Sequence, residues 1–373
     1  MSIKRKLLLV TAGFPFGDSE RSFLTTEFQH LQEKFDITIL ALNNSLPLIF
    51  DMPKDVIVER YILPPIKRYG TFFKLHKLLN RDVFKEMKIA VKYCKSNIII
   101  KRLKMIITSY LNALEAKKKL CQLVKKNNID LIYTYWCTDV TIGAVLLKKK
   151  LPNIKVITRF HGIDLYRERK EAEWQCFRVL IGDKCDKMCF ACKAALNYFV
   201  NTWGEKYEVK SHVYYLGSKV VLNRNINTTG EFTIISCSNM IPLKRINLII
   251  DGLALLSKNI KVKWHHFGDG ELRVALEEYA KKTILNSVDW CFHGHMKNEE
   301  LIKSYIELGA QLFISTSSTE GGVPVSIMEA SSIGIPTIAT AVGGIPEIVI
   351  SGETGILLDK DITGQNVKDA ILS

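Results

Sequence analysis

The stretch that most constrains the fold runs from Ser315 to Glu347, STSSTEGGVPVSIMEASSIGIPTIATAVGGIPE. It follows an apolar segment and passes through a loop with two glycines, Gly321 and Gly322. A helix is then expected to begin between residues 324 and 326. Residues 337–340 form a short apolar run typical of a buried strand. A strand, a glycine loop, a helix and a second strand make a βαβ unit, which predicts a parallel sheet.

The residues of this loop and helix also predict a kind of ligand. Glycines allow backbone N–H groups to come close to an anion, and the start of a helix directs its positive end toward that anion. Glu320 lies in the loop and Glu329 lies one turn inside the helix. Carboxylates accept hydrogen bonds from sugar hydroxyl groups. The segment therefore predicts a site for a phosphate next to a polyol.

On these residues the segment resembles the nucleotide-sugar site of the retaining glycosyltransferases of family 4, which have the GT-B fold. That family usually has seven residues between a loop glutamate and a helix glutamate, followed by Gly-x-Pro and Gly-Gly-x-x-Glu. Here Glu320 and Glu329 are separated by eight residues, and the extra one falls in 321–323. The resemblance implies an α/β protein with two Rossmann-like doubly wound domains facing a cleft, which we place at 1–220 and 221–373.

A second motif of this kind follows the strand expected at residues 232–236. Residues 237–245, CSNMIPLKR, resemble the family's Gly-Arg-Leu-x-x-x-Lys-Gly turn, in which two cations grip the donor diphosphate. Lys244 takes the position of the lysine, Asn239 that of the arginine and Arg245 that of the glycine. Because the start of a helix disfavours cations, two of them there predict a bound anion that compensates their charge.

The first domain carries the resemblance at two places. Residues 6–10 and 35–42 are expected strands on either side of a glycine loop and a helix, and G-x-G-x-x-G is absent. The family's first loop approaches the donor diphosphate, which implicates Gly13 and Gly17. His161 starts a His-Gly-x-Asp motif after the strand expected at 155–159, where open α/β sheets bind ligands. The alternative for His161 is a histidine that only satisfies a loop hydrogen bond.

The positive charge of the chain is concentrated in one block. The formal net charge is +14, and residues 60–128 alone hold 18 Lys and Arg against 3 Asp and Glu. This block has a helical pattern with apolar residues between lysines. It is either a solvated face of ordinary helices or a basic surface that lies on anionic lipid headgroups. We expect no nucleic acid as a partner, since no binding module accompanies the charge.

The sequence predicts no metal site and no cofactor. Cys185, Cys189 and Cys192 have no second pair at zinc spacing and are expected to be buried, while Asp359-Lys360-Asp361 is expected to be a turn. His293 and His295 are also expected to be turn residues. The nine cysteines suit reduced thiols in a cytosol, and no apolar run has the length of a membrane span.

The resemblance implies transfer of a sugar, with retention, from a UDP- or GDP-sugar to a glycan or lipid-linked acceptor in surface polysaccharide synthesis. The protein is expected in the cytoplasm, with the block 60–128 on the inner face of the membrane. Two residues hold the donor sugar and are the catalytic candidates, His161 and Glu320. The donor-binding candidates are Lys244, Arg245, Glu329, Gly321, Gly322, Asn239, Gly13 and Gly17.

An alternative is a catalytically inert GT-B protein that binds a nucleotide-sugar or a partner transferase. The longer spacing between Glu320 and Glu329 and the asparagine at 239 fit that alternative. The chain ends at Ser373 in an expected helix that begins at Gln365. Family members usually continue with a helix that returns to the first domain, so this final helix is expected to be missing.

Overall fold

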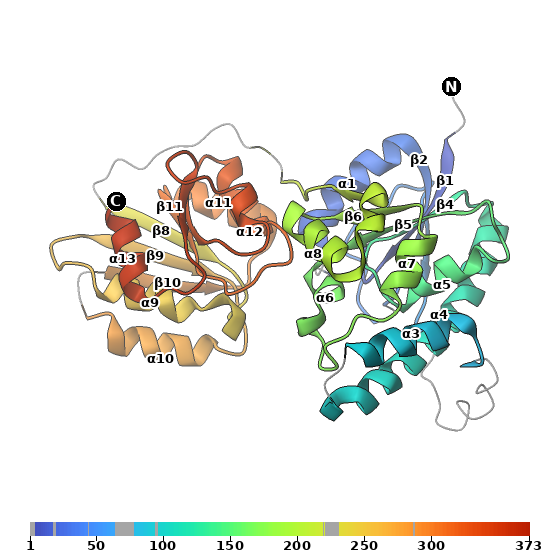
Figure 1. The fold of residues 1–373 in the computed structure, drawn as a ribbon. Helices are drawn as coiled ribbons and strands as arrows, with labels where there is room; N and C mark the ends of the chain where they lie inside the picture. Colours follow the sequence, from blue (N-terminus) through green and yellow to red (C-terminus); the bar gives the residue numbers. More distant parts are fainter. Residues whose placement is uncertain are drawn as a thin grey trace. The chain divides into compact units, whose positions relative to one another are not determined.

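The chain divides after Tyr215 into two α/β units, Met1–Tyr215 and Leu216–Ser373 (Figure 1). The structure, a computed structural model, describes residues 4–17, 20–43, 45–63, 78–93, 96–218, 220, 231–285 and 288–373. The division falls slightly before the predicted boundary at 220, because the last strand of the first unit ends at Val213. The sequence also predicts a linker at residues 223–231, and all of it except Glu231 lies outside the described residues.

The first unit contains a parallel sheet with the strand order β3-β2-β1-β4-β5-β6-β7. Its strands are β1 (Arg5–Thr11), β2 (Phe35–Ala41), β3 (Ile57–Arg60), β4 (Leu131–Thr134), β5 (Lys155–Phe160), β6 (Lys187–Phe190) and β7 (Ser211–Val213). The order reverses between β1 and β4, which is the topological switch point of a doubly wound sheet. The opening βαβ unit was predicted, whereas β3, which has only four residues, was not.

The helices of this unit cover both faces of its sheet. They are α1 (Arg21–Lys34), α3 (Arg81–Lys92), α4 (Ile99–Asn127), α5 (Asp139–Leu147), α6 (Gly162–Leu165), α7 (Arg178–Lys184) and α8 (Lys193–Trp203), with short 3-10 turns at Ser96–Ile98, Arg167–Arg169 and Glu205–Lys210. Alternate residues of β1 enter different cores. Leu7 packs with Phe28 of α1, and Leu8 packs with Ile106 of α4 and Ile142 of α5. An uninterrupted apolar strand is therefore buried on both sides.

The second unit repeats this architecture with the strand order β10-β9-β8-β11-β12-β13, again all parallel. Its strands are β8 (Phe232–Cys237), β9 (Val262–Phe267), β10 (Val288–Gly294), β11 (Leu312–Ser315), β12 (Thr337–Thr340) and β13 (Gly355–Leu358). The switch point lies between β8 and β11. His293, predicted to be a turn residue, lies inside β10, because the strand continues to Gly294.

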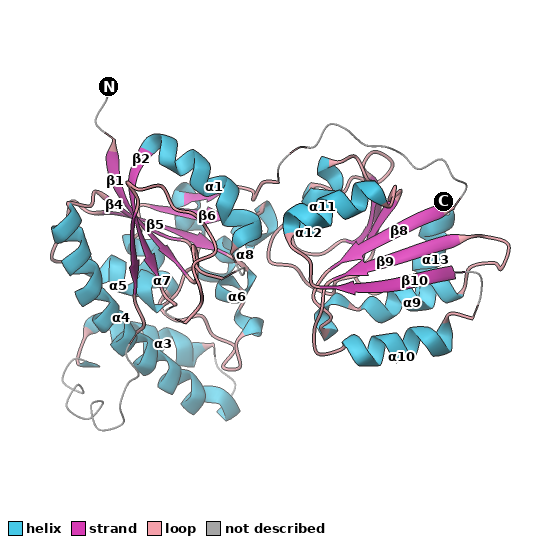
Figure 2. Cartoon of the chain, turned by 180° about the vertical axis from the view of Figure 1, so that it is seen from behind, coloured by secondary structure: helices cyan, strands magenta, loops and turns pink. Residues whose placement is uncertain are grey.

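Helices cover both faces of the second sheet as well (Figure 2). They are α9 (Ile246–Ala254), α10 (Arg273–Thr283), α11 (Asn298–Glu307), α12 (Val325–Ser332) and α13 (Gly364–Leu372), with 3-10 turns at Pro242–Lys244 and Ile345–Glu347. α9, α10 and α13 pack on the face of Ile234, and α11 and α12 pack on the face of Ile235. The sequence analysis did not predict α11.

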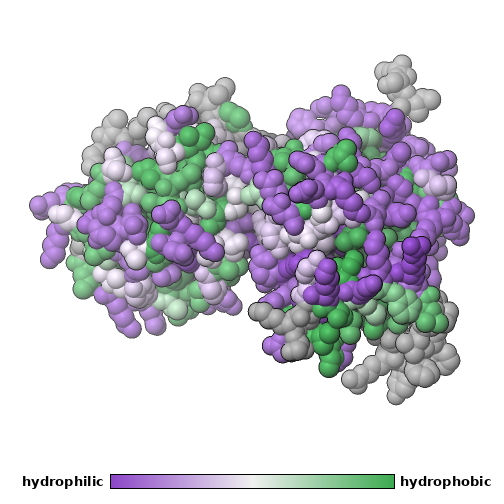
Figure 3. All heavy atoms as spheres, viewed as in Figure 1, coloured by the Kyte–Doolittle hydropathy of each residue, from purple (hydrophilic) through white to green (hydrophobic). Residues whose placement is uncertain are grey.

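The basic block consists mainly of α3 and α4, and residues 64–77 and 94–95 of it lie outside the described residues. Part of its charge is compensated within the same unit, because Lys119 and Lys126 both pair with Glu59. α3 has an exposed face that mixes basic and apolar side chains, and green spheres gather there in Figure 3. Among the described helices, none has the length and apolar character needed to span a bilayer.

Candidate functional site

The carboxyl ends of β8 and β11 form the switch point of the second sheet, and most of the predicted donor residues lie there. These two strands are hydrogen-bonded neighbours, with Leu312 in register with Ile234. The chain leaves β8 through residues 238–245 and leaves β11 through residues 316–324. In open α/β sheets, ligands bind in the crevice outside the strand ends at such a point.

Lys244 and Glu320 meet at this switch point. The Lys244 ammonium group donates a hydrogen bond to Oε1 of Glu320, and both side chains are largely shielded from water. The two residues are 76 positions apart in the sequence. They come together because the turn after β8 and the loop after β11 leave adjacent strands on the same edge of the sheet.

Arg245 has a different place from the one predicted. Its backbone is left-handed, with φ of 48°, at the position where the family usually has glycine. Its guanidinium group donates to three carbonyl oxygens, those of Thr316 (2.7 Å), Ser317 (3.2 Å) and Lys360 (2.8 Å). This side chain ties together the loops after β8, β11 and β13.

The positive charges of Lys244 and Arg245 therefore do not require the bound anion that the sequence predicted. The chain compensates both cations itself, Arg245 through carbonyl groups and Lys244 through Glu320. Their presence at the start of α9 is by itself no evidence for a bound phosphate. The position of Lys244 at the switch point is what supports a phosphate site. We regard Arg245 as a residue that positions Lys244.

Glu329 is a buried carboxyl group on α12, with 3% of its surface exposed. Oε1 accepts a hydrogen bond from the side-chain amide of Asn298, the first residue of α11. Burial raises the pKa of Glu329 to about 7, because desolvation disfavours the charged form. Asn298 was missed by the sequence analysis, since a lone asparagine at the start of an unpredicted helix carries no recognisable pattern.

The glycine loop between Glu320 and α12 lies beside the loop after β12. Gly343 has φ of 57°, and a Cβ atom there would lie 2.5 Å from the carbonyl oxygen of Glu320. The amide of Gly344 donates to the carbonyl of Gly322 at 3.1 Å. Within the described residues, the amides of Gly321 and Gly322 themselves donate to no protein acceptor. Asn239 is exposed in the loop after β8.

His161 is buried at the carboxyl end of β5 in the first unit. A ring nitrogen, Nε2, lies 3.1 Å from the carbonyl oxygen of Tyr135, and the ring centroid lies 4.1 Å from that of Trp136. Burial, and secondarily the charge of Arg159, lowers the pKa of His161 to about 3. The imidazole is therefore neutral at physiological pH and serves as a hydrogen-bonding group rather than as a titrating acid or base.

Asp164, the last residue of the same motif, joins two loops. Its carboxylate accepts from the amides of His161 (2.6 Å) and Cys137 (2.7 Å), which follow β5 and β4. Burial raises the pKa of this group to about 7. These contacts make Asp164 a residue that positions His161 rather than one that receives a ligand hydroxyl group.

In the loop after β1, which was expected to approach the donor diphosphate, the backbone amides have partners within the protein. The carboxylate of Glu20, which is 1% exposed, accepts from the amides of Ala12 (3.0 Å), Gly13 (2.6 Å) and Phe14 (2.7 Å). The amide of Gly17 donates to Pro47, and φ of 68° explains the glycine. Both Gly13 and Gly17 therefore shape the loop, and neither amide is available to a donor phosphate.

A cavity of about 790 Å³ lies at the switch point of the first sheet. Its lining includes the ends of β1 and β4 and is mostly apolar, with Leu42, Met105 and Trp174 among the contributors. Lys104 and Lys170 supply positive charge. A larger cavity, about 920 Å³, is lined by the first residues of several strands, the opposite edge from the one where such sheets bind ligands.

Comparison with protein families gives two matches along the chain. Residues 222–373 match the family described as glycosyl transferases group 1. Residues 85–189 match the family described as glycosyl transferase 4-like. The first match contains every predicted donor residue of the second unit, and the second contains His161.

Three curated relatives share this similarity. An uncharacterized glycosyltransferase, MJ1178 of Methanocaldococcus jannaschii, is 27% identical over 252 residues, which are 67% of this chain and 66% of the relative. The N-acetyl-alpha-D-glucosaminyl L-malate synthase of Bacillus anthracis is 23% identical over 257 residues, 66% of each chain. A putative colanic acid biosynthesis glycosyltransferase, WcaL of Salmonella typhimurium, is 25% identical over 37% of this chain and 35% of its own. The chain thus matches about two thirds of the length of the first two relatives.

Solved structures share the fold along nearly the whole chain. The lipopolysaccharide outer core galactosyltransferase WaaB has a TM-score of 0.68 at 14% identity, over 98% of this chain and 89% of its own. Alr3699/HepE of Anabaena in complex with UDP-glucose has a TM-score of 0.64 at 15% identity, over 98% and 88%. These likenesses confirm the predicted GT-B fold. The two family matches identify the chain as a member of the group 1 glycosyltransferases of the glycosyltransferase 4-like type.

Proposed function

We propose that this protein transfers a glycosyl group, with retention, from a UDP- or GDP-sugar to a glycan or lipid-linked acceptor in surface polysaccharide synthesis. The observation that carries the proposal is the pairing of Lys244 with Glu320 at the switch point of the second sheet. The loop of Glu320 leads into α12, which carries buried Glu329. Family membership supports the reaction class, and the similarity to WcaL supports the role in polysaccharide synthesis.

The main chemical task is to stabilise charge on the departing nucleoside diphosphate. In our proposal the diphosphate takes over the contact that Lys244 makes with Glu320. The amides of Gly321 and Gly322 donate to phosphate oxygens, and Glu329 accepts from the ribose hydroxyl groups. Glu320, released from Lys244, then holds the donor sugar. Neutral His161 of the first unit is suited to hydrogen-bond a sugar hydroxyl group.

Retention requires the acceptor to attack from the face that the leaving group departs from. The bond between the anomeric carbon and the phosphate oxygen breaks, and its electron pair stays on the diphosphate. The acceptor oxygen forms the new bond, and its proton passes to a phosphate oxygen. His161 is unsuited to take this proton, because its pKa of about 3 makes it a poor base at neutral pH.

The acceptor is assigned to the cavity of about 790 Å³ in the first unit. Apolar side chains dominate its lining, and ligand pockets of this kind use a few polar groups to fix orientation. Lys104 and Lys170 suit an anionic group such as a phosphate. This combination favours a lipid-linked acceptor over a purely polar glycan.

The exposed face of α3 is the part of the basic block that suits a membrane surface. Arg81, Lys85, Lys88 and Lys92 lie on it together with Phe84 and Val91, which are 57% and 44% exposed. A helix with basic and apolar residues on its outer face binds anionic lipid interfaces. We therefore place the protein at the inner face of the membrane, where a lipid-linked acceptor is found.

A thermal-shift screen of nucleoside diphosphates and their sugars tests donor binding, because a ligand that binds only the folded state raises the melting temperature with concentration. Lys244→Gln is expected to remove that rise, whereas Lys282→Gln, an exposed lysine of α10, is expected to keep it. Equal responses of the two variants would contradict the site.

Turnover separates an enzyme from an inert binding protein. Release of nucleoside diphosphate from a panel of UDP- and GDP-sugars, followed with purified protein, is expected for at least one donor and is expected to be lost in Lys244→Gln. Tight binding of a donor with no turnover, even in the presence of membrane extracts as a source of acceptor, would favour the inert alternative.

A further inference from the structure

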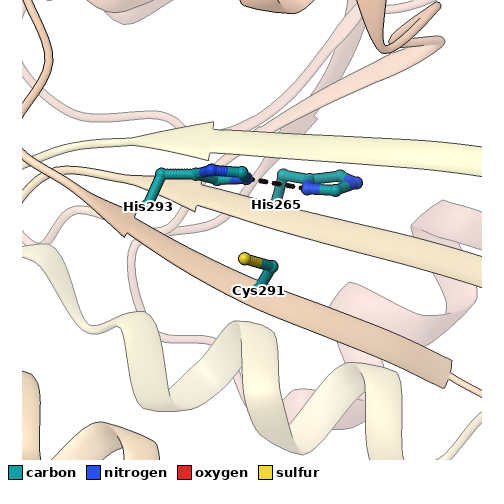
Figure 4. A group of neighbouring side chains, drawn as sticks. All are labelled: His265, Cys291 and His293. Carbon is teal, nitrogen blue, oxygen red and sulfur yellow. Dashed lines mark hydrogen bonds between the residues drawn. The ribbon is translucent and has the colours of Figure 1, made fainter.

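Three side chains that can act as metal ligands lie close together on the second sheet, and none of them is a predicted donor residue. They are His265 of β9 and Cys291 and His293 of β10, and their ligand atoms all lie within 4.8 Å of one another. Figure 4 shows the two imidazole rings joined edge to edge by a hydrogen bond, with the Cys291 sulfur beside them. His265 Nδ1 and His293 Nε2 are 2.8 Å apart.

Strand register explains why these residues meet. Cys291 is paired with His265 across the two parallel strands. His293 follows Cys291 by two residues, so both project from the same face of the strand. The register also shifts between Phe292 and Gly294, which makes His293 the extra residue of a β-bulge. Bulges redirect side chains and are frequent at sheet edges and beside functional sites, and β10 is the edge strand.

We propose that His265, Cys291 and His293 form a binding site for a divalent transition-metal ion of the zinc class. One thiolate and two imidazole nitrogens are the ligands that such ions prefer, whereas Mg²⁺ and Ca²⁺ prefer oxygen. The three residues supply three of four tetrahedral positions. Cys291 and His293 are exposed, so the fourth position is open to water or to a side chain of another molecule.

The three side chains must adjust their positions to receive the ion. Metal–ligand bonds of about 2.0–2.3 Å place tetrahedral ligand atoms roughly 3.5 Å apart. The two nitrogens must therefore separate slightly from 2.8 Å, and the sulfur must move toward them. Phe267 stacks on the His293 ring, with centroids 4.5 Å apart and planes 8° apart, and so fixes its orientation.

Binding of the ion changes the number of protons on these three side chains by one. The hydrogen bond between the rings places one proton between His265 Nδ1 and His293 Nε2. On binding, both rings keep one proton each on the nitrogen that faces away from the ion, and the Cys291 thiol releases its proton to water. No electron is transferred. Each ion bound thus releases one proton from the protein, and it links edge strand β10 to β9.

The experiment uses the full chain, with any affinity tag removed and trace metals stripped by a chelator. Titration with Co²⁺ is expected to give a thiolate-to-cobalt absorption band that saturates at one ion per chain, and Zn²⁺ is expected to displace Co²⁺ and abolish the band. Zn²⁺ at saturation is expected to raise the melting temperature. Absence of a thiolate band, or saturation at several ions per chain, would overturn the proposal.

Matched variants locate the site. Cys291→Ser and His265→Gln are expected to weaken Zn²⁺ binding by at least about a hundredfold. Loss of a residue that only hydrogen-bonds to a metal ligand already costs up to about a hundredfold in affinity, and loss of the ligand itself should cost more. His295→Gln, in the adjoining loop, and Cys121→Ser, on α4, are expected to leave it unchanged. Circular dichroism checks that each variant is folded. Unchanged binding in Cys291→Ser would refute the site, as would equal losses in the control variants.

Discussion

Glu329 shows how one buried residue makes ligand binding depend on pH. Burial raises its pKa to about 7, so the group is largely protonated at pH 6 and largely ionised at pH 8. The ionised form accepts hydrogen bonds through both oxygens, whereas protonation turns one oxygen into a donor and weakens the carboxyl group as an acceptor of the ribose hydroxyl groups. We expect the affinity for the donor nucleotide to rise about tenfold from pH 6 to pH 8, since the ionised fraction rises by that factor.

Isothermal titration of UDP or GDP, whichever nucleotide the thermal-shift screen selects, measures this dependence. Glu329→Gln removes the titrating group while keeping the acceptor of Asn298, so its affinity is expected to be lower and nearly independent of pH over the same range. A wild-type affinity that stays flat between pH 6 and pH 8 would mean that Glu329 does not contact the ligand.

The same carboxyl group affects stability without ligand. Its pKa is raised on folding, so the native state holds a proton that the unfolded state loses between about pH 4.5 and pH 7. Protonated Glu329 therefore stabilises the native state fully below this range. This stabilisation is lost as the pH rises through 7 and the buried carboxyl group ionises. Between pH 5 and pH 8 we expect wild type to lose up to about 3 kcal/mol relative to Glu329→Gln. Urea unfolding at a series of pH values measures the difference, and parallel curves for the two proteins would contradict it.

Glu20 is expected to be a large local determinant of stability in the first unit. Its carboxylate accepts hydrogen bonds from three consecutive amides and from the indole of Trp136. Removing a buried acceptor leaves such donors unsatisfied, at a cost of about 1–3 kcal/mol for each group. Glu20→Ala is therefore expected to lower the free energy of unfolding by at least about 2 kcal/mol. Glu33→Ala, an exposed glutamate of α1, serves as the control and is expected to change it by less than about 0.5 kcal/mol.

At the scale of elements, α3 is the part of the basic block whose outer face is not buried against the unit. Each lysine near an anionic surface contributes about 1 kcal/mol to binding. Lys88→Glu combined with Lys92→Glu is therefore expected to weaken binding to vesicles containing anionic lipid by tenfold or more. Lys281→Glu with Lys282→Glu, on α10, is the matched charge change and is expected to have little effect. Flotation of the proteins with vesicles measures this, and failure of wild type to float would remove the membrane from the proposal.

At the scale of the whole molecule, the two units have separate apolar cores. Among the described residues, buried apolar side chains of the first unit form two clusters and those of the second unit form two others. We expect calorimetry to show two unfolding transitions, and donor nucleotide to raise only the one that belongs to residues 216–373. Leu253→Ala truncates a fully buried residue of α9 and is expected to cost about 2–5 kcal/mol in the free energy of unfolding of the second unit. The transition whose temperature it lowers is therefore the one that belongs to residues 216–373. A single transition that shifts as a whole would show that the units unfold together.

Much of this architecture follows from sequence pattern. The strand at 337–340 was predicted with its observed bounds, and those at 35–42, 155–159 and 232–236 were predicted to within one residue, because a short apolar run between turn residues is a local signal. β3 was missed, since a four-residue edge strand carries little periodicity. α11 was also missed, although Leu301, Ile302, Tyr305 and Ile306 have helical spacing and Leu301 and Tyr305 are buried. The prediction that His293 is a turn residue was wrong, because β10 continues past the apolar residues that marked the strand in the sequence.

The sequence by itself determined the fold class and the family, because glycine loops, buried strands and the His-Gly-x-Asp motif are local and contiguous. Only the tertiary structure decided what each side chain contacts. Lys244 pairs with Glu320, and the Arg245 guanidinium group donates to three carbonyl groups. The Glu20 carboxylate accepts from the amides of the first loop, and His265 lies next to Cys291 and His293. These contacts join residues far apart in the chain, and strand order and register, which follow from packing the whole sheet, fix which of them meet.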